Sequence, residues 1–170
     1  LQGIPATHLL QPDDREELAR LTHEKYVEMK QKRLAKKDAA VAPWDTLAPN
    51  LKQSNYSQID HIEAKLNAVG LTLHKRDDPA DVRPVDFTAQ EMDDKVRTMA
   101  DLEHARWTVE RLQDGWKPGP RDHERKRTPY LVPWPELPPD IQQYDIDPVL
   151  ETLRELEKRG YEVVDMDREP

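Results

Sequence analysis

Apolar residues at helical spacing mark the second quarter of the chain most clearly. Between residues 59 and 69 they recur every three or four positions, at Ile59, Ile62, Leu66 and Val69. This spacing places them on one face of a helix. Ser54 or Asn55 is expected to cap this helix and Gly70 to end it, because serine and asparagine favour N-caps and glycine favours the C′ position. Residues 71–73 then predict a short strand.

A second apolar stripe predicts a longer helix in the other half of the chain. Its residues share one helical face, and they are Met92, Val96, Met99, Leu102, Val109 and Leu112. Thr88 and Glu91 have the spacing of a capping box, and Gly115 is suited to end a helix that runs to about Asp114. We therefore expect one continuous helix between these two signals.

The N-terminal part of the chain predicts a helix with only a thin apolar stripe. It is expected to begin at Asp13 or Asp14 and to include residues 15–37, because acidic residues stabilise the start of a helix and lysines its end. Residues 75–87 are charged and interrupted by proline, so we expect them to connect two units. Residues 116–140 are rich in proline, which argues against a long helix or a central strand there.

The C-terminal part of the chain repeats the signals that surround Gly70. Asp147 and Pro148 form an N-cap and N1 pair, and Gly160 is expected to end the helix that they begin. The weak alternation of residues 161–164 predicts a strand, as after Gly70. The similarity of these two ends prompts a search for an internal repeat.

Two tryptophans stand at the same distance from these two glycines. Trp44 precedes Gly70 by 26 residues, and Trp134 precedes Gly160 by 26 residues. In this register further pairs align, namely Pro43 with Pro133, Leu47 with Leu137, Ile59 with Val149 and Leu66 with Leu156. We infer an internal duplication whose two units pack about a pseudo-twofold axis, because neither unit alone has enough apolar surface to be stable.

This organisation divides the chain into five segments. They are an N-terminal boundary segment (1–17), a first repeat (18–74), a linker (75–87), a second repeat (88–165) and a C-terminal tail (166–170). The expected fold class is mainly α with short β-strands. Since the chain begins with Leu1 rather than Met, we expect it to be a piece of a longer protein.

The second unit carries motifs at specific spacing. Residues 103–122 read EHARWTVERLQDGWKPGPRD, and residues 129–137 read PYLVPWPEL. These segments closely resemble the RyR repeat, the domain named after the ryanodine receptor. Residues 43–70 resemble the N-terminal half of the two-repeat version found in bacteria, and phages also carry the domain. One departure is that the first unit lacks the Gly-Trp dipeptide, which occurs here only at Trp116.

The resemblance implies a mainly helical module of two RyR repeats without enzymatic activity. In receptor pairs of this family, the cleft between the repeats can hold an adenine nucleotide. For bacterial members it implies a small anionic ligand of ATP-like or ADP-ribose-like kind, and a fused or partner signalling domain that responds to it. The alternative is a structural module that binds a protein within a larger signalling or channel-associated protein.

Arg106 lies on the apolar face of the predicted helix 88–114. A guanidinium there needs partners, and Glu103 and Glu110 lie three and four residues away. His104 lies one position round the helix, with Trp107 three residues further on. Two interpretations stay open. These residues form a structural ion-pair network between the repeats, or they line the cleft with Arg106 or His104 facing a phosphate or ribose.

Trp116 opens a basic loop, residues 117–127, which carries five cationic and two acidic side chains. A planar ring beside cations suits an adenine nucleotide, so Trp116 is expected to stack on the base. Arg121, Lys126 and Arg127 are expected to bind its phosphates. The alternative is that this loop is only a solvated basic segment.

Further candidates come from another aromatic ring and from a polar row. Trp134 is a possible ligand contact, although its place in the repeat favours a role in the core. The polar row recurs off the apolar face of the helix before Gly70 and consists of Asn55, Gln58, His61 and Lys65. These four residues are either exposed to solvent, or they face the other repeat across the cleft and donate hydrogen bonds to the ligand.

Composition argues against several other functions. The chain has no cysteine, which removes disulfides, thiol nucleophiles and Cys-ligated metals. Its net charge of −8 argues against general nucleic-acid binding. We find no membrane-length apolar run and no signal peptide, so a cytoplasmic location is the default. Walker A, G-x-S-x-G and HExxH motifs are also missing from the sequence, and we expect no metal, no cofactor and no enzymatic activity.

Overall fold

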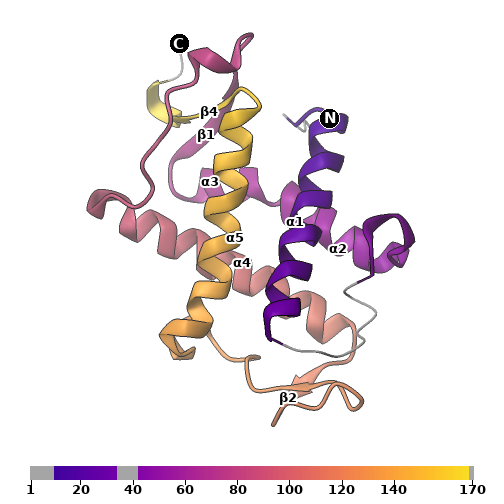
Figure 1. Ribbon diagram of the computed structural model, residues 1–170. Coiled ribbons are helices and arrows are strands. Elements are labelled where there is room, and N and C mark those ends of the chain that lie inside the picture. Colours follow the sequence, from indigo (N-terminus) through magenta and orange to yellow (C-terminus); the bar gives the residue numbers. More distant parts are fainter. Residues whose placement is uncertain (1–9, 34–41, 169–170) are drawn as a thin grey trace, which may run out of the picture.

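The computed structural model describes residues 10–33 and 42–168, which form a mainly helical fold (Figure 1). The helices are α1 (Pro12–Arg33), α2 (Pro49–Asp60), α3 (Ile62–Ala68), α4 (Asp93–Gln113) and α5 (Pro139–Lys158). The strands are β1 (Leu71–Lys75), β2 (Lys117–Pro118), β3 (Arg127–Thr128) and β4 (Tyr161–Asp165). The expected fold class, mainly α with short strands, is confirmed. None of the described helices combines the length and apolar character that crossing a membrane requires.

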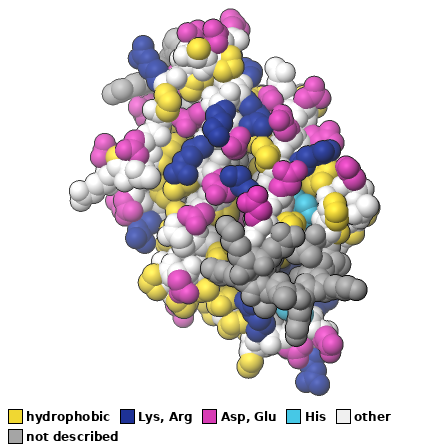
Figure 2. Space-filling view, viewed as in Figure 1, with side chains coloured by type: hydrophobic (Ala, Val, Ile, Leu, Met, Phe, Trp, Pro, Cys, Tyr) yellow, Lys and Arg dark blue, Asp and Glu magenta, His cyan; other side chains and the backbone are white. Residues whose placement is uncertain are grey.

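The helices pack across one another rather than in a parallel bundle. Helix α5 crosses α4, and α1 packs against α2 (Figure 1). Ion pairs join α1 to α5, with Lys25 Nζ 3.7 Å from Glu151 Oε2 and Arg159 Nη2 3.0 Å from Glu17 Oε1. Acidic and basic side chains are interleaved over the described part of the face that Figure 2 shows. This face therefore carries no extended patch of one sign.

Strands β1 and β4 form an antiparallel ribbon that joins the two halves of the sequence. Leu73 lies opposite Val163 in its register. Each strand follows a glycine with positive φ, 79° at Gly70 and 93° at Gly160. Both glycines end their helices as expected, because this left-handed conformation disfavours every residue with a Cβ atom.

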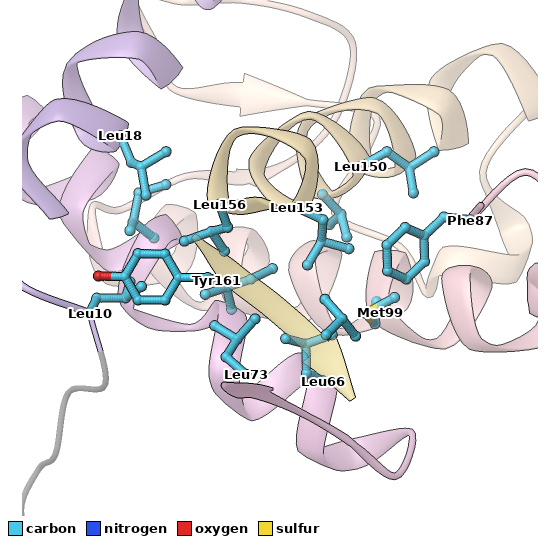
Figure 3. Packing of buried hydrophobic residues seen from close by; sticks show 14 of the residues in the cluster. Leu10, Leu18, Leu66, Leu73, Phe87, Met99, Leu150, Leu153, Leu156 and Tyr161 are labelled. Carbon is cyan, nitrogen blue, oxygen red and sulfur yellow. The ribbon is translucent and has the colours of Figure 1, made fainter. Parts of the chain in front are cut away.

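The main hydrophobic core lies where α1, α3, α4 and α5 meet the ribbon (Figure 3). Its most deeply buried side chains come from both halves of the sequence and include Leu66, Met99, Leu153, Leu156 and Tyr161. A smaller cluster contains Ala100, Trp134 and Leu137. The two halves therefore share one main core.

The start of α2 differs from the prediction. The helix begins at Pro49 in its first turn, after Ala48, and not at Ser54 or Asn55. Proline suits this position because the first N–H groups of a helix have no partner within the helix. Ser54 instead donates a hydrogen bond to Glu110. The helix is also interrupted at His61, where α3 follows α2.

The predicted capping box at the start of α4 does not form. Thr88 donates from its amide and hydroxyl to Asp86, and a 3₁₀ turn at Gln90–Met92 precedes the helix. The prediction of a buried apolar face is also wrong for the C-terminal half of α4. Val109 is 53% exposed and Leu112 is 54% exposed, because no described element covers this side of α4.

The two terminal helices begin earlier than expected. Helix α5 begins at Pro139, and Pro148 lies inside it rather than at its first position. Pro139, which follows Pro138, takes the first helical position instead and starts the helix. Helix α1 begins at Pro12, and residues 34–37 of the predicted helix lie outside the described residues.

The two segments compared in the repeat alignment have the same order of elements. Each starts with a 3₁₀ turn, at Trp44–Thr46 and at Trp134–Glu136, and each continues through helix to strand. Two imidazoles, one in each half of the sequence, make the same kind of contact. His23 Nε2 lies 2.6 Å from the Ala42 carbonyl oxygen, and His104 Nε2 lies 2.7 Å from that of Val132. The pseudo-twofold relation itself stays a prediction.

Candidate ligand-binding site

Two sides of α4 carry four of the residues that the sequence predicts for ligand binding. One side faces α2 and α3 and holds Glu103, Arg106 and Glu110. The other side holds His104 and Trp107. The positions along α4 fix this division, because each residue turns by about 100° relative to the one before it.

A buried charge network occupies the first side and consists of Lys65, Glu103, Arg106 and Glu110. Lys65 Nζ lies 2.7 Å from Glu103 Oε1, and these side chains are 1% and 7% exposed. The Arg106 guanidinium donates to both Glu103 oxygens, at 2.9 and 2.7 Å, and lies 2.9 Å from Glu110 Oε1. The expected partners of Arg106 are therefore confirmed. Ser54 donates to Glu110 at 2.8 Å, so the buried charge network joins α2 and α3 to α4.

The pKa shifts in the buried charge network follow from its geometry. Burial alone would raise the pKa of Glu103, but its hydrogen bond from Arg106 and the charge of Lys65 outweigh burial and lower this pKa. Burial lowers the pKa of Lys65, against the attraction of Glu103. Burial likewise opposes ionisation of Arg106, yet the two glutamates raise its pKa. Arg106 is consequently held as a cation between the two glutamates.

Asp145 adds a fifth acid–base group beside the buried charge network. Burial raises the pKa of this carboxyl to about 7, and the charge of Glu103 acts in the same direction. His104 Nδ1 lies 3.6 Å from Asp145 Oδ2. Since a carbonyl oxygen only accepts, His104 Nε2 must donate to Val132, which leaves Nδ1 for Asp145. His104 Nδ1 thus faces the Asp145 carboxylate at a separation longer than a hydrogen bond.

An aromatic ladder runs along the second side of α4 and beyond its end, through Trp107, Arg111, Trp116 and His123. The Arg111 guanidinium lies 5.5 Å from the Trp107 ring centroid and 5.3 Å from that of Trp116. The rings of His123 and Trp116 meet edge to face at 5.5 Å. The His104 ring stacks on Trp107 at 5.6 Å. Arg111 has no carboxylate within ion-pair distance in the described part of the chain.

The basic loop folds back under the aromatic ladder. Strands β2 and β3 pair within it, and Lys126 has a left-handed backbone with φ 54°. Lys126 Nζ donates to the Asp114 backbone oxygen at 2.8 Å and lies 3.2 Å from its carboxylate. Arg127 donates to the backbone oxygens of residues 125 and 126. The Arg121 guanidinium lies 5.8 Å from the Tyr130 ring centroid.

The structure separates the predicted site residues into two groups. Trp107, Trp116, Arg121, Lys126 and Arg127 belong to the surface of the aromatic ladder and the basic loop. Trp116 is half-buried and makes a hydrogen bond to Asp114, so it is not a core residue. Of the other predicted residues, Lys65, Glu103 and Arg106 belong to the buried charge network, and His61 lies close enough to feel its charges.

The polar row of α2 and α3 is not a solvent-exposed face. Lys65 is fully buried against Glu103, and Asn55 donates to the Leu51 carbonyl oxygen at 3.0 Å. Gln58 and His61 are half-buried. Exposure was thus the wrong interpretation for Lys65, because α4 covers the side of α3 from which it projects. Trp134 is 6% exposed, which confirms its predicted place in a core cluster.

Three polar atoms of this buried region make no hydrogen bond within the described part of the molecule. They are His61 Nδ1, Arg106 Nη1 and Trp134 Nε1. Burial lowers the pKa of His61, and the neighbouring Lys65 charge adds to this effect. His61 is therefore a neutral imidazole whose ring nitrogens can donate or accept.

Three residues at the aromatic ladder were missed by the sequence analysis, and they are Arg111, Asp114 and His123. Arg111 lies four residues after Trp107, a spacing that brings side chains together on one helical face and could have been recognised. Asp114 accepts from both Trp116 Nε1 and Lys126 Nζ, each at 3.2 Å. Its contact with Lys126 depends on the fold of the basic loop, and no local pattern in the sequence signals it.

Two surface hollows lie elsewhere in the described structure. One, of about 330 Å³, lies at the β1–β4 ribbon and is lined by Leu71, Val85, Met92 and Val163 to Asp165. The other, of about 310 Å³, lies between the linker and the end of α5. Neither hollow is lined by a residue that the sequence predicts for ligand binding.

Comparison with known protein families matches residues 77–165 to the RyR domain. The matched region contains α4, the basic loop, α5 and β4, and it therefore includes the whole aromatic ladder. No curated protein matches the chain. Because the match covers more than half of the sequence, the chain belongs to the RyR domain family.

Proposed function

We propose that this RyR-domain chain is a binding module, without enzymatic activity, for a small anionic ligand of adenine-nucleotide kind. The observation that carries the proposal is the Arg111 guanidinium between the indoles of Trp107 and Trp116. Indole rings offer stacking surfaces for a base, worth about 1–3 kcal/mol for each stacked base. A guanidinium without a carboxylate partner offers two parallel donors to a phosphate.

The basic loop supports the same proposal. It contributes Lys117, Arg121 and Arg127, and none of these side chains lies within ion-pair distance of a described carboxylate. Its five cationic and two acidic residues give a local charge of +3 on a chain whose net charge is −8. A positive region on an acidic body attracts small anions and concentrates them at one place.

Within this proposal the buried charge network has a supporting role. Arg106 is ion-paired with Glu103 and Glu110, so we assign it to fixing α4 against α3 rather than to contacting the ligand. His104 positions the Trp107 ring by stacking. His61 and Trp134 offer the unused polar atoms through which a ligand group could reach this region. The sequence suggests Arg106 as the phosphate contact. We assign this contact to Arg111 instead.

In this proposal the module reports ligand occupancy to a fused or partner signalling domain, in a cytoplasmic setting. The groups of the aromatic ladder supply stacking surface and positive charge, which serve recognition rather than bond breaking. Incubation with ATP or ADP-ribose should therefore return the nucleotide unchanged. Release of phosphate or ribose products would contradict the non-enzymatic assignment.

The test is calorimetric titration of the chain with ATP and with ADP-ribose. Trp116→Ala should weaken binding by about 1–3 kcal/mol, the range for loss of one base–aromatic stack. Its melting temperature should stay close to that of the parent, since Trp116 is half-buried and outside both core clusters. Trp116→Phe, which keeps a ring, is the matched control and should retain part of the affinity.

Adenosine and inorganic pyrophosphate serve as probes of the two halves of the ligand. Each should bind more weakly than ATP, because each uses only the stacking surface or only the cations. Absence of binding by all four compounds would overturn the proposed function.

A protein-interaction module is the second candidate function. Val109 and Leu112 are more than half exposed near the C-terminal end of α4, and exposed apolar side chains that form a contiguous patch mark docking surfaces. Val109→Ser with Leu112→Ser, which removes the apolar side chains without adding charge, should leave nucleotide binding unchanged if the ligand proposal is correct. Loss of partner binding in this variant, together with no nucleotide binding by the parent, would favour the alternative.

A further inference from the structure

The Asp114 carboxylate is the acidic group in direct contact with the aromatic ladder. Its Oδ2 accepts a hydrogen bond from Trp116 Nε1 at 3.2 Å, and its Oδ1 lies 3.2 Å from Lys126 Nζ. The two donors come from opposite ends of the basic loop. An anion is thus already held between an indole N–H and an ammonium group at this place.

The surroundings of this carboxylate are cationic. The Arg111 guanidinium lies against the same Trp116 ring, and Lys117 follows it in the chain. Within the described residues Arg111 has no carboxylate partner of its own, so Asp114 only partly neutralises the positive charge here. The position suits a negative group, and a phosphate carries more negative charge than a carboxylate.

The backbone of the basic loop, rather than Asp114 alone, sets the position of Lys126. Lys117 N donates to the Lys126 carbonyl oxygen at 3.0 Å, and the Asp122 and Arg127 backbones exchange hydrogen bonds at 3.1 and 2.8 Å. Lys126 also keeps a contact to the Asp114 backbone oxygen at the end of α4. Lys126 Nζ would therefore stay near this position if the Asp114 carboxylate moved away.

The contact between the two charges is exposed and easily exchanged. The Lys126 and Asp114 side chains are 46% and 57% exposed, and ion pairs with this exposure contribute little to stability. We propose that the Asp114 carboxylate occupies the anion position of the ligand site in the free protein, so that an anionic ligand must displace it from Lys126. This inference rests on the proposed function and adds a built-in competitor to its site.

The test compares two variants that remove one negative charge from the same region. Asp114→Asn keeps an oxygen that accepts from Trp116 Nε1 but removes the charge that holds Lys126. It should bind ATP about fivefold more tightly than the parent, the change expected for loss of one like charge at about 4 Å in water. The gain should shrink as salt is added.

Asp122→Asn is the matched control. Asp122 lies in the basic loop beside Arg125, at 3.9 Å, and has no contact with Trp116 or Lys126 side chains among the described ones. It should change ATP affinity much less than Asp114→Asn does. A second readout is the NMR signal of the Trp116 indole N–H, which ATP should shift in the parent as its acceptor changes.

The outcomes separate the two claims. If the parent binds ATP and Asp114→Asn binds it equally or more weakly, the competitor inference is wrong while the proposed function stands. If Asp114→Asn and Asp122→Asn gain the same affinity for ATP, the gain comes from the change in net charge, and the inference is also overturned. If parent and variants bind neither ATP nor ADP-ribose, the proposed function fails and the inference fails with it.

Discussion

At the scale of single residues, Asp145 shows how the fold sets the charge state of a side chain. The other charges beside it already balance, with Lys65 and Arg106 against Glu103 and Glu110. An ionised Asp145 is therefore a surplus negative charge in this region. Burial and the charge of Glu103 raise the pKa of Asp145 to about 7, against an ordinary value of 3.8. The fold thus favours the protonated form of Asp145 up to about pH 7.

Asp145→Asn should change how stability depends on pH. Because the pKa of Asp145 is raised in the folded state, its favourable contribution is complete below pH 3.8 and is lost as pH rises towards 7. The difference corresponds to about 4 kcal/mol. Denaturant unfolding should show the free energy of unfolding of the variant rising relative to that of the parent between pH 4 and pH 8 by about this amount.

Asp147→Asn is the control, since it removes an exposed carboxylate from the same helix. Its free energy of unfolding should follow that of the parent at every pH. If the free energies of unfolding of Asp145→Asn and the parent differ by the same amount at every pH between 4 and 8, the raised pKa of Asp145 is contradicted.

Local spacing determines which residue contacts the sequence could predict. The partners of Arg106 follow from positions three and four residues away on one helix, and both are present. The burial of Lys65 depends instead on α4, which is distant in sequence and packs over α3. The same holds for Asp114, whose partner Lys126 is brought back by the basic loop. Contacts of this second kind need the tertiary structure.

At the scale of elements, glycine and proline mark the ends of helices with different reliability. Gly70 and Gly160 were predicted as helix ends, because the left-handed conformation after a helix strongly selects glycine. Helix starts were predicted less well. Serine, threonine and aspartate occur in many contexts, whereas the proline at the first turn sets the true start of α2 and α5.

The two helix-ending glycines should differ in their tolerance of alanine. A Cβ at Gly70 meets no atom within 4 Å, so Gly70→Ala should cost only the strain of a left-handed residue, about 1 kcal/mol. A Cβ at Gly160 would lie 3.2 Å from Lys75 Nζ and 3.3 Å from the Arg76 carbonyl oxygen. Gly160→Ala should therefore cost about 2 kcal/mol or more by denaturant unfolding. Equal losses in the two variants would show that the β1–β4 ribbon relaxes freely around Gly160.

At the scale of the whole molecule, the two sequence halves depend on each other for burial. The β1–β4 ribbon takes one strand from each half, and the main core takes side chains from α1 and α3 as well as α4 and α5. The buried ion pair of Lys65 and Glu103 also spans the halves. The duplication inferred from the sequence is therefore not a pair of independent domains, because neither half encloses its own apolar residues.

The shared core predicts that the whole chain unfolds cooperatively. Leu66 and Leu153 lie in different halves, and each is completely buried in the same cluster. Leu66→Ala and Leu153→Ala should each cost about 2–5 kcal/mol, because each leaves a cavity in the core. Each should shift one common unfolding transition, measured by far-ultraviolet circular dichroism and by tryptophan fluorescence together. Separate transitions for the two probes, with Leu66→Ala moving only one of them, would contradict a single core. Stable folding of residues 1–74 without the rest of the chain would contradict it as well, since that fragment lacks α4, α5 and the strand partner of β1.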